Sequence, residues 1–124
     1  MKLRCLVVDD NHGFLQSAVR LLEGESVAVV GVATSGSEAL RRTVELSPDV
    51  LLLDVDLGRE NGFEVAVRLQ QQGHLPASNV IMISAHAEDD LVDLLAGSPV
   101  AGFLPKAQLS AARIQHMLET GQRG

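Results

Sequence analysis

The chain has little of what nucleic-acid-binding, membrane-spanning or disulfide-linked proteins need. It contains one cysteine, Cys5, which excludes an internal disulfide, and its only lysines are Lys2 and Lys106. The net charge is −6, so no basic stripe is present to neutralise a nucleic-acid backbone or an anionic membrane. No apolar run approaches the roughly 20 residues of a membrane span. We therefore expect neither direct nucleic-acid binding nor a membrane segment.

A signal peptide is also missing, because Met1 leads directly into Lys2-Leu3-Arg4 without a longer apolar stretch. This predicts a cytoplasmic location. The 124 residues, 46% of them hydrophobic, suit one domain with a single core and are too few for two. We expect one domain over residues 1–124.

Short apolar runs alternate along the chain with segments of helical period, the pattern of successive βα units. It predicts an α/β fold, a doubly wound parallel sheet of five strands with five helices. The expected strands are 3–8, 27–33, 50–53, 80–83 and 101–104. The expected helices are 13–23, a segment from the capping box at 35–38 to Pro48, a segment from the end of the loop 54–62 to residues 72–73, then 88–96 and 109–119.

Four of the expected strands end on residues able to handle a phosphoryl group. These residues are Asp9 and Asp10, Asp54, Ser84 and Lys106. Because the carboxyl ends of parallel strands lie at one edge of the sheet, where open α/β folds bind their ligands, we expect these residues to meet. Three carboxylates, one hydroxyl and one ammonium would then share a pocket.

Three unpaired carboxylates at close range would repel one another, so the pocket implies a cation. Carboxylate oxygens without a histidine or cysteine cluster favour Mg²⁺, with Mn²⁺ as the second choice. A carboxylate at Asp54 could attack phosphorus to form an aspartyl phosphate, and Lys106 could stabilise the phosphoryl oxygens. Taken singly, each residue also has a plainer interpretation: a turn or helix cap for the aspartate pair, a strand end for Ser84, and a solvated loop cation for Lys106.

Four segments together resemble the receiver domain of two-component response regulators: VVDDNH at 7–12, LLLDVDLGRENGFEV at 51–65, VIMISAH at 80–86 and AGFLPK at 101–106. The resemblance implies a flavodoxin-like strand order, 2-1-3-4-5. It also implies a role for each site residue: Asp54 as phosphoacceptor, Asp9 and Asp10 as Mg²⁺ ligands together with Asp54 and the backbone carbonyl of Asp56, Ser84 and Lys106 as contacts of the phosphoryl group, and Phe103 as the switch aromatic.

By this resemblance the domain is a signalling module rather than an enzyme, catalysing only its own phosphorylation and dephosphorylation. The phosphoryl donor would be a sensor histidine kinase or a phosphotransfer protein. Phosphorylation would draw Ser84 inward, let Phe103 turn inward, and shift the surface of 88–96, 101–104 and 109–119. That surface would meet a partner, an output domain or a second copy in a homodimer. The GFLPK segment resembles receivers of transcription regulators that carry a helix-turn-helix output, so two alternatives stay open: a whole protein, or the receiver of a longer regulator with an output domain.

The chain departs from the family pattern at two positions. Gly58 and Ala107 stand where proline is common, which leaves the cis or trans state of the Lys106–Ala107 peptide open. Two further residues, Asp56 and His86, lie two positions beyond Asp54 and Ser84 and border the path of the hydrolytic water in receivers. We predict that they tune the lifetime of the phosphoryl group; the alternative is two solvated loop residues.

Two other functions fit parts of the pattern. Residues 51–58 also look like the Asp-x-Asp nucleophile motif of haloacid-dehalogenase-type phosphatases. Those enzymes carry this motif first and their acidic pair last, which is the reverse of the order here. The second alternative is a receiver-like binding module that works without phosphorylation, against which the complete set of site residues argues.

Overall fold

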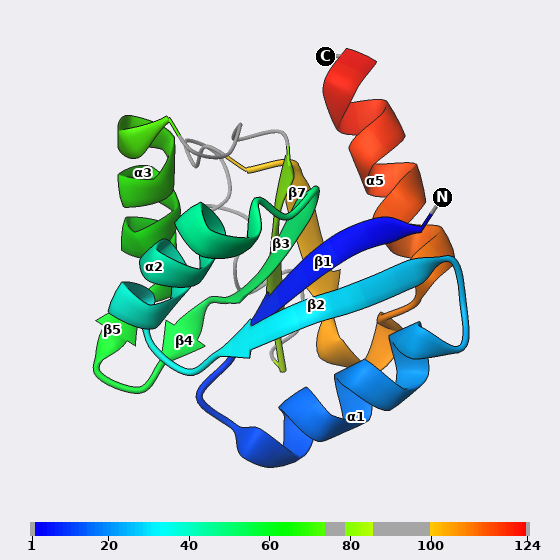
Figure 1. Cartoon of the computed structure of the whole chain (residues 1–124), viewed down its shortest axis with the longest axis horizontal. Helices are drawn as coiled ribbons and strands as arrows, with labels where there is room; N and C mark the ends of the chain where they lie inside the picture. The colour runs from blue at the N-terminus through cyan, green and yellow to red at the C-terminus, as the bar shows by residue number, and fades with distance from the viewer. Residues whose placement is uncertain (1, 74–78, 86–99, 124) are drawn as a thin grey trace.

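A computed structural model of the chain describes residues 2–73, 79–85 and 100–123. Five parallel strands form one sheet in the order β2-β1-β3-β6-β7 (Figure 1). They are β1 (Leu3–Val8), β2 (Val27–Ala33), β3 (Val50–Asp54), β6 (Val80–Ser84) and β7 (Gly102–Pro105). Since β6 and β7 are the fourth and fifth expected strands, the predicted order 2-1-3-4-5 is confirmed.

Helices cover both faces of the sheet. The helices α1 (His12–Glu23) and α5 (Ala111–Arg123) pack on one face, and α2 (Gly36–Leu46) and α3 (Gly62–Gln72) pack on the other (Figure 1). Strand residues alternate between the two cores: Leu6 and Val8 face α2 and α3, whereas Cys5 and Val7 face α1 and α5. The expected helix 88–96 lies outside the described residues.

Capping residues set the starts of two helices, both within two residues of the predicted positions. The Asn11 side chain accepts a hydrogen bond from the Phe14 N–H at 3.1 Å, so α1 begins at His12, one residue before the predicted start. The last helix, predicted from about residue 109, begins two residues later, after Lys106–Gln108 form a short 3₁₀ helix, η3. The Ser110 hydroxyl then accepts from the Arg113 N–H at 3.2 Å, and α5 follows from Ala111 to Arg123, past the predicted end at residue 119.

The expected irregular loop 54–62 contains a small antiparallel hairpin, β4 (Asp56–Leu57) and β5 (Glu60–Asn61). Its two-residue turn starts at Gly58, whose φ of 68° lies in the left-handed region. Proline cannot adopt that angle, so this turn is incompatible with the residue that is common in the family at this position. No cis peptide bond occurs among the described residues, so the Lys106–Ala107 peptide is trans.

Candidate functional site

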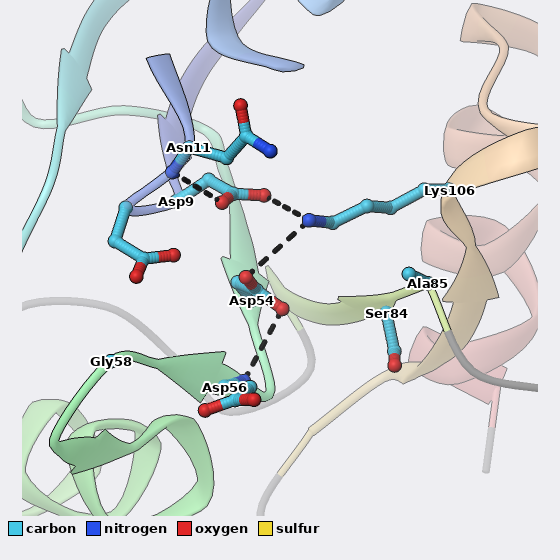
Figure 2. A pocket seen from close by; sticks show the side chains of 9 residues that line it. Asp9, Asn11, Asp54, Asp56, Gly58, Ser84, Ala85 and Lys106 are labelled. Carbon is cyan, nitrogen blue, oxygen red and sulfur yellow. Dashed lines mark hydrogen bonds and ion pairs between the residues drawn. The ribbon is translucent and has the colours of Figure 1, made fainter. Parts of the chain in front are cut away.

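A pocket of about 280 Å³ lies at the carboxyl edge of the sheet (Figure 2). It is lined by residues from the ends of β1, β3, β6 and β7 and from the hairpin: Asp9, Asp10, Asn11, Asp54, Asp56, Gly58, Ser84, Ala85 and Lys106. The structure thus brings together the predicted carboxylates, hydroxyl and ammonium, as parallel strand ends should. Of the predicted site residues that the structure describes, Phe103 alone does not line the pocket.

Asp9 and Lys106 form the closest charge pair of the pocket. Asp9 is fully buried, and its Oδ1 accepts a hydrogen bond from the Asn11 N–H at 2.9 Å. The Lys106 Nζ lies 2.6 Å from Asp9 Oδ2 (Figure 2). A buried carboxylate needs such a countercharge, so Lys106 compensates Asp9 in this state. Asp10, in contrast, is exposed to solvent.

Asp54 lies at the centre of the pocket and is only 5% exposed. Its Oδ1 accepts from the Asp56 N–H at 3.2 Å, and its Oδ2 lies 3.4 Å from Lys106 Nζ. Burial raises the pKa of Asp54 to about 6, with the negative charge of Asp9 acting in the same direction. The Asp56 N–H and the Lys106 ammonium oppose this rise without cancelling it. The surroundings therefore make Asp54 a weaker acid than a free aspartate, although its carboxyl is still mostly ionised at neutral pH.

Lys106 stays charged in this pocket. Burial would lower its pKa, but the hydrogen bond to Asp9 and the charges of Asp54 and Asp9 outweigh it and raise the pKa overall. An ammonium between two carboxylates also limits the repulsion between them. The site thus holds a fixed positive charge beside the Asp54 oxygens.

The carboxylates could also hold a metal ion. One oxygen each from Asp9, Asp10 and Asp54 lies within 4.8 Å of the others. Asp9 Oδ2 is fully buried, and its close partner is the Lys106 ammonium at 2.6 Å. Hard carboxylate oxygens suit Mg²⁺ or Mn²⁺. The donor set therefore fits the predicted metal, with the Asp56 backbone nearby on the hairpin.

Ser84 and Phe103 differ in their relation to the pocket. Ser84 is 2% exposed, and its hydroxyl points away from the Asp54 carboxylate (Figure 2). Phe103 is buried in the core beneath α2 and α3, with Met82 in the same cluster. Phe103 is therefore already buried in this structure, which does not contain the outward conformation from which the expected inward turn would begin. His86 lies outside the described residues, and the Asp56 side chain is exposed.

Three residues around the pocket were missed by the sequence analysis. Asn11 caps α1 and holds Asp9; its place after Asp9-Asp10 at a helix start was an available signal. The Phe14 ring centroid lies 4.5 Å from Lys106 Nζ. Glu60 Oε1 accepts from the N–H of Gly36 at 2.8 Å, which ties the hairpin to the first turn of α2. The last two contacts join distant segments, so no local pattern predicts them.

Gly62 packs closely against the end of strand β3, and we expect Gly62→Ala to destabilise the domain. A Cβ at this position would lie 2.0 Å from the Asp54 carbonyl oxygen, so the backbone of one segment must move. Overpacking of this kind costs about 1–3 kcal/mol or more of unfolding free energy. Urea denaturation followed by far-UV circular dichroism measures it. Gly24→Ala is the matched control, because its Cβ would meet nothing within 4 Å; equal midpoints for both variants would refute the prediction.

Within residues 2–73, 79–85 and 100–123, no helix combines the length and apolar character required to cross a bilayer.

Comparisons with known proteins agree with this fold. The family model described as the response regulator receiver domain matches residues 5–119. Response regulator GacA of Pseudomonas viridiflava is 34% identical over 98% of this chain and 57% of its own length. The transcriptional regulatory protein LiaR of Bacillus subtilis is 28% identical over the same shares. The chain therefore spans just over half the length of these two regulators.

Two further similar proteins differ in how much of their own length this chain covers. A protein-glutamate methylesterase/protein-glutamine glutaminase of Geobacter sulfurreducens is 35% identical over 73% of this chain, but only 24% of that protein is covered. The signal receiver domain of the NarL response regulator from Mycobacterium tuberculosis superposes with a TM-score of 0.80 at 32% identity, covering 98% of this chain and 97% of that one. The chain belongs to the response regulator receiver domain family.

Proposed function

We propose that the domain accepts a phosphoryl group on Asp54 in a Mg²⁺-dependent reaction and thereby switches a partner or an output domain. One observation carries the proposal: a buried carboxylate, Asp54, lies within reach of both an acidic cation site and the Lys106 ammonium. In a signalling domain of the receiver family, this arrangement would serve to accept a phosphoryl group. The donor would be a sensor histidine kinase or a phosphotransfer protein.

In the proposed reaction an Asp54 oxygen forms a bond to phosphorus while the bond between phosphorus and the donor nitrogen breaks. The nucleophile must be ionised, and its pKa of about 6 leaves it mostly so at neutral pH. Lys106 can exchange part of its contact with Asp9 for a phosphoryl oxygen, because its Nζ already lies between the two carboxylates. Little acid or base chemistry is needed, since phosphoryl transfer depends mainly on positioning and charge.

The metal would be held by the carboxylates of Asp9, Asp10 and Asp54 and by the backbone carbonyl of Asp56. When bound, Mg²⁺ or Mn²⁺ supplies positive charge to the phosphoryl oxygens and offsets the repulsion among the carboxylates. The hairpin β4–β5 would position the Asp56 carbonyl for the metal. It carries Asp56 and is fixed to α2 through Glu60.

The switch would run from the pocket through Ser84 to the surface formed by residues 88–96, β7 and α5. Ser84 is directed away from Asp54 here, so a turn toward a phosphoryl group is the change we propose. Phe103 lies in the core beneath α2 and α3 and would respond by repacking there. The same surface would serve a homodimer contact. The activity of a whole regulator, including any output domain, and a cytoplasmic location remain predictions.

The two alternatives have less support. A haloacid-dehalogenase-type phosphatase would require the acidic pair after the nucleophile motif, whereas Asp9 and Asp10 precede Asp54. A phosphorylation-independent module would not need the Lys106 contacts with both carboxylates. We therefore propose that the domain turns over no external phosphomonoester and catalyses only its own phosphorylation and dephosphorylation.

The test is phosphorylation of the purified chain by a small donor. Incubation with acetyl phosphate and Mg²⁺ should add the mass of one phosphoryl group, measured by intact-protein mass spectrometry. Adding EDTA in excess over Mg²⁺ should abolish the added mass, because the carboxylates are left uncompensated against the incoming anion. Restoring Mg²⁺ or supplying Mn²⁺ should bring it back. Equal uptake with and without the metal would contradict metal dependence, and no uptake under any condition would contradict the proposal.

A further inference from the structure

We propose that Phe14 is a positioning residue for Lys106, holding its ammonium at the α1 side of the pocket through a cation–π contact. The proposal rests on the proposed function for its kinetic consequence, but the contact itself belongs to the unphosphorylated domain. Phe14 does not line the pocket, so it would act through Lys106 rather than touch the reacting atoms.

The contact joins two distant segments. The Phe14 ring belongs to the first turn of α1, and the Lys106 Nζ lies 4.5 Å from its centroid. The face of an aromatic ring carries negative potential, so an ammonium at this distance is attracted to it. Lys106 enters from the end of β7, and its side chain is 18% exposed, which makes the contact partly shielded from water.

The position of Phe14 is fixed by the same short segment that fixes Asp9. Asn11 donates its N–H to Asp9 Oδ1 at 2.9 Å and accepts the Phe14 N–H on its side chain at 3.1 Å. The ring is half-buried against the core formed with α1 and α5. The carboxylate and the ring that contact the ammonium are therefore held in one rigid arrangement.

Positioning matters because lysine has a long, flexible side chain. Two carboxylates attract the Lys106 Nζ from the sheet, Asp9 at 2.6 Å and Asp54 at 3.4 Å, while Phe14 contacts it from a helix. If Asp54 became phosphorylated, the ammonium would have to move a short way to a phosphoryl oxygen. A third contact that is not an anion restricts the rotamers of Lys106 without competing for the phosphoryl group.

Replacement by leucine separates this role from simple packing. Phe14→Leu keeps an apolar side chain against the core but removes the ring, whereas Phe14→Tyr keeps the ring and places its hydroxyl at a half-exposed position. A packing role predicts similar behaviour for both variants. A cation–π role predicts that tyrosine retains the function and leucine does not. Far-UV circular dichroism checks that both fold, and Phe14→Met replaces the leucine variant if that one does not.

The direct test uses the scarcity of lysine. Protein labelled with ¹³C at lysine Cε gives two signals, from Lys2 and Lys106, and Lys2→Arg identifies them. The ring current of Phe14 should displace the Lys106 signal upfield from the Lys2 signal in the wild type and in Phe14→Tyr. In Phe14→Leu the displacement should collapse. An unchanged Lys106 signal in Phe14→Leu would overturn the proposed contact, whether or not the domain is phosphorylated.

The kinetic test uses acetyl phosphate, so that no partner docking is involved. The initial rate of mass increase should fall about two- to fivefold in Phe14→Leu, the loss expected from a partly exposed cation–π contact, and stay near the wild-type rate in Phe14→Tyr. Equal rates in all three proteins would overturn the positioning role. Absence of phosphorylation in the wild type would instead refute the proposed function, and the lysine signals would still decide whether the contact exists.

Discussion

Replacement of Asp54 by asparagine is expected to abolish phosphoryl uptake from acetyl phosphate in the presence of Mg²⁺. The amide keeps the shape of the side chain but has no anionic oxygen to attack phosphorus. Asp54 is also the carboxylate at the centre of the pocket, bonded to the Asp56 N–H and close to Lys106. Intact-protein mass spectrometry measures the result directly, as the loss of the phosphorylated species.

Asp56→Asn is the matched control for this experiment. It removes the same charge two residues away, on an exposed side chain, while the backbone carbonyl proposed as a metal ligand remains. We expect this variant to take up one phosphoryl group, with a changed rate of loss if Asp56 tunes its lifetime. Full uptake by Asp54→Asn would place the phosphoacceptor at another residue. If Asp56→Asn also lost all uptake, that residue would be Asp56.

The sheet and the meeting of the site residues could be predicted because both depend on local patterns. Each strand is a short apolar run, and a residue at the end of such a run must lie at the carboxyl edge if the strands are parallel. The meeting of four residues in one pocket could therefore be predicted without any knowledge of long-range contacts: Asp9, Asp54, Ser84 and Lys106. The strand order itself came from the family resemblance, since alternation of elements does not fix it.

What could not be predicted depends on contacts between distant segments or on competing local choices. Lys106–Gln108 form a 3₁₀ turn, and Ser110, one residue after the predicted helix start, caps the helix that follows. The contact of Phe14 with Lys106 depends on how α1 packs against the end of β7. The direction of the Ser84 hydroxyl and the burial of Phe103 are properties of one conformation, and a sequence carries no mark of which conformation a side chain adopts.

The second large expected effect concerns stability: in EDTA, Asp54→Asn should make the domain more stable than the wild type at neutral pH. The folded-state pKa of Asp54 is about 6, against an ordinary value of 3.8, chiefly because burial disfavours the charged form. A carboxyl whose pKa is raised in the folded state loses its proton at a lower pH in the unfolded chain than in the folded domain. As pH rises from about 4 to 6, the unfolded state therefore binds fewer protons and the free energy of unfolding falls.

The size of this effect follows from the rise of the Asp54 pKa from 3.8 to about 6, which corresponds to a loss on the order of 1–3 kcal/mol of unfolding free energy between acidic and neutral pH. Urea denaturation of the wild type in EDTA, followed by far-UV circular dichroism, should show the decline, and Asp54→Asn should lack it. Asp56→Asn, which removes an exposed charge, should decline like the wild type. Parallel curves for the wild type and Asp54→Asn between pH 4 and 7 would show that the site does not strain the Asp54 carboxylate. A decline that Mg²⁺ reverses would tie the instability to the charge that the metal is proposed to neutralise.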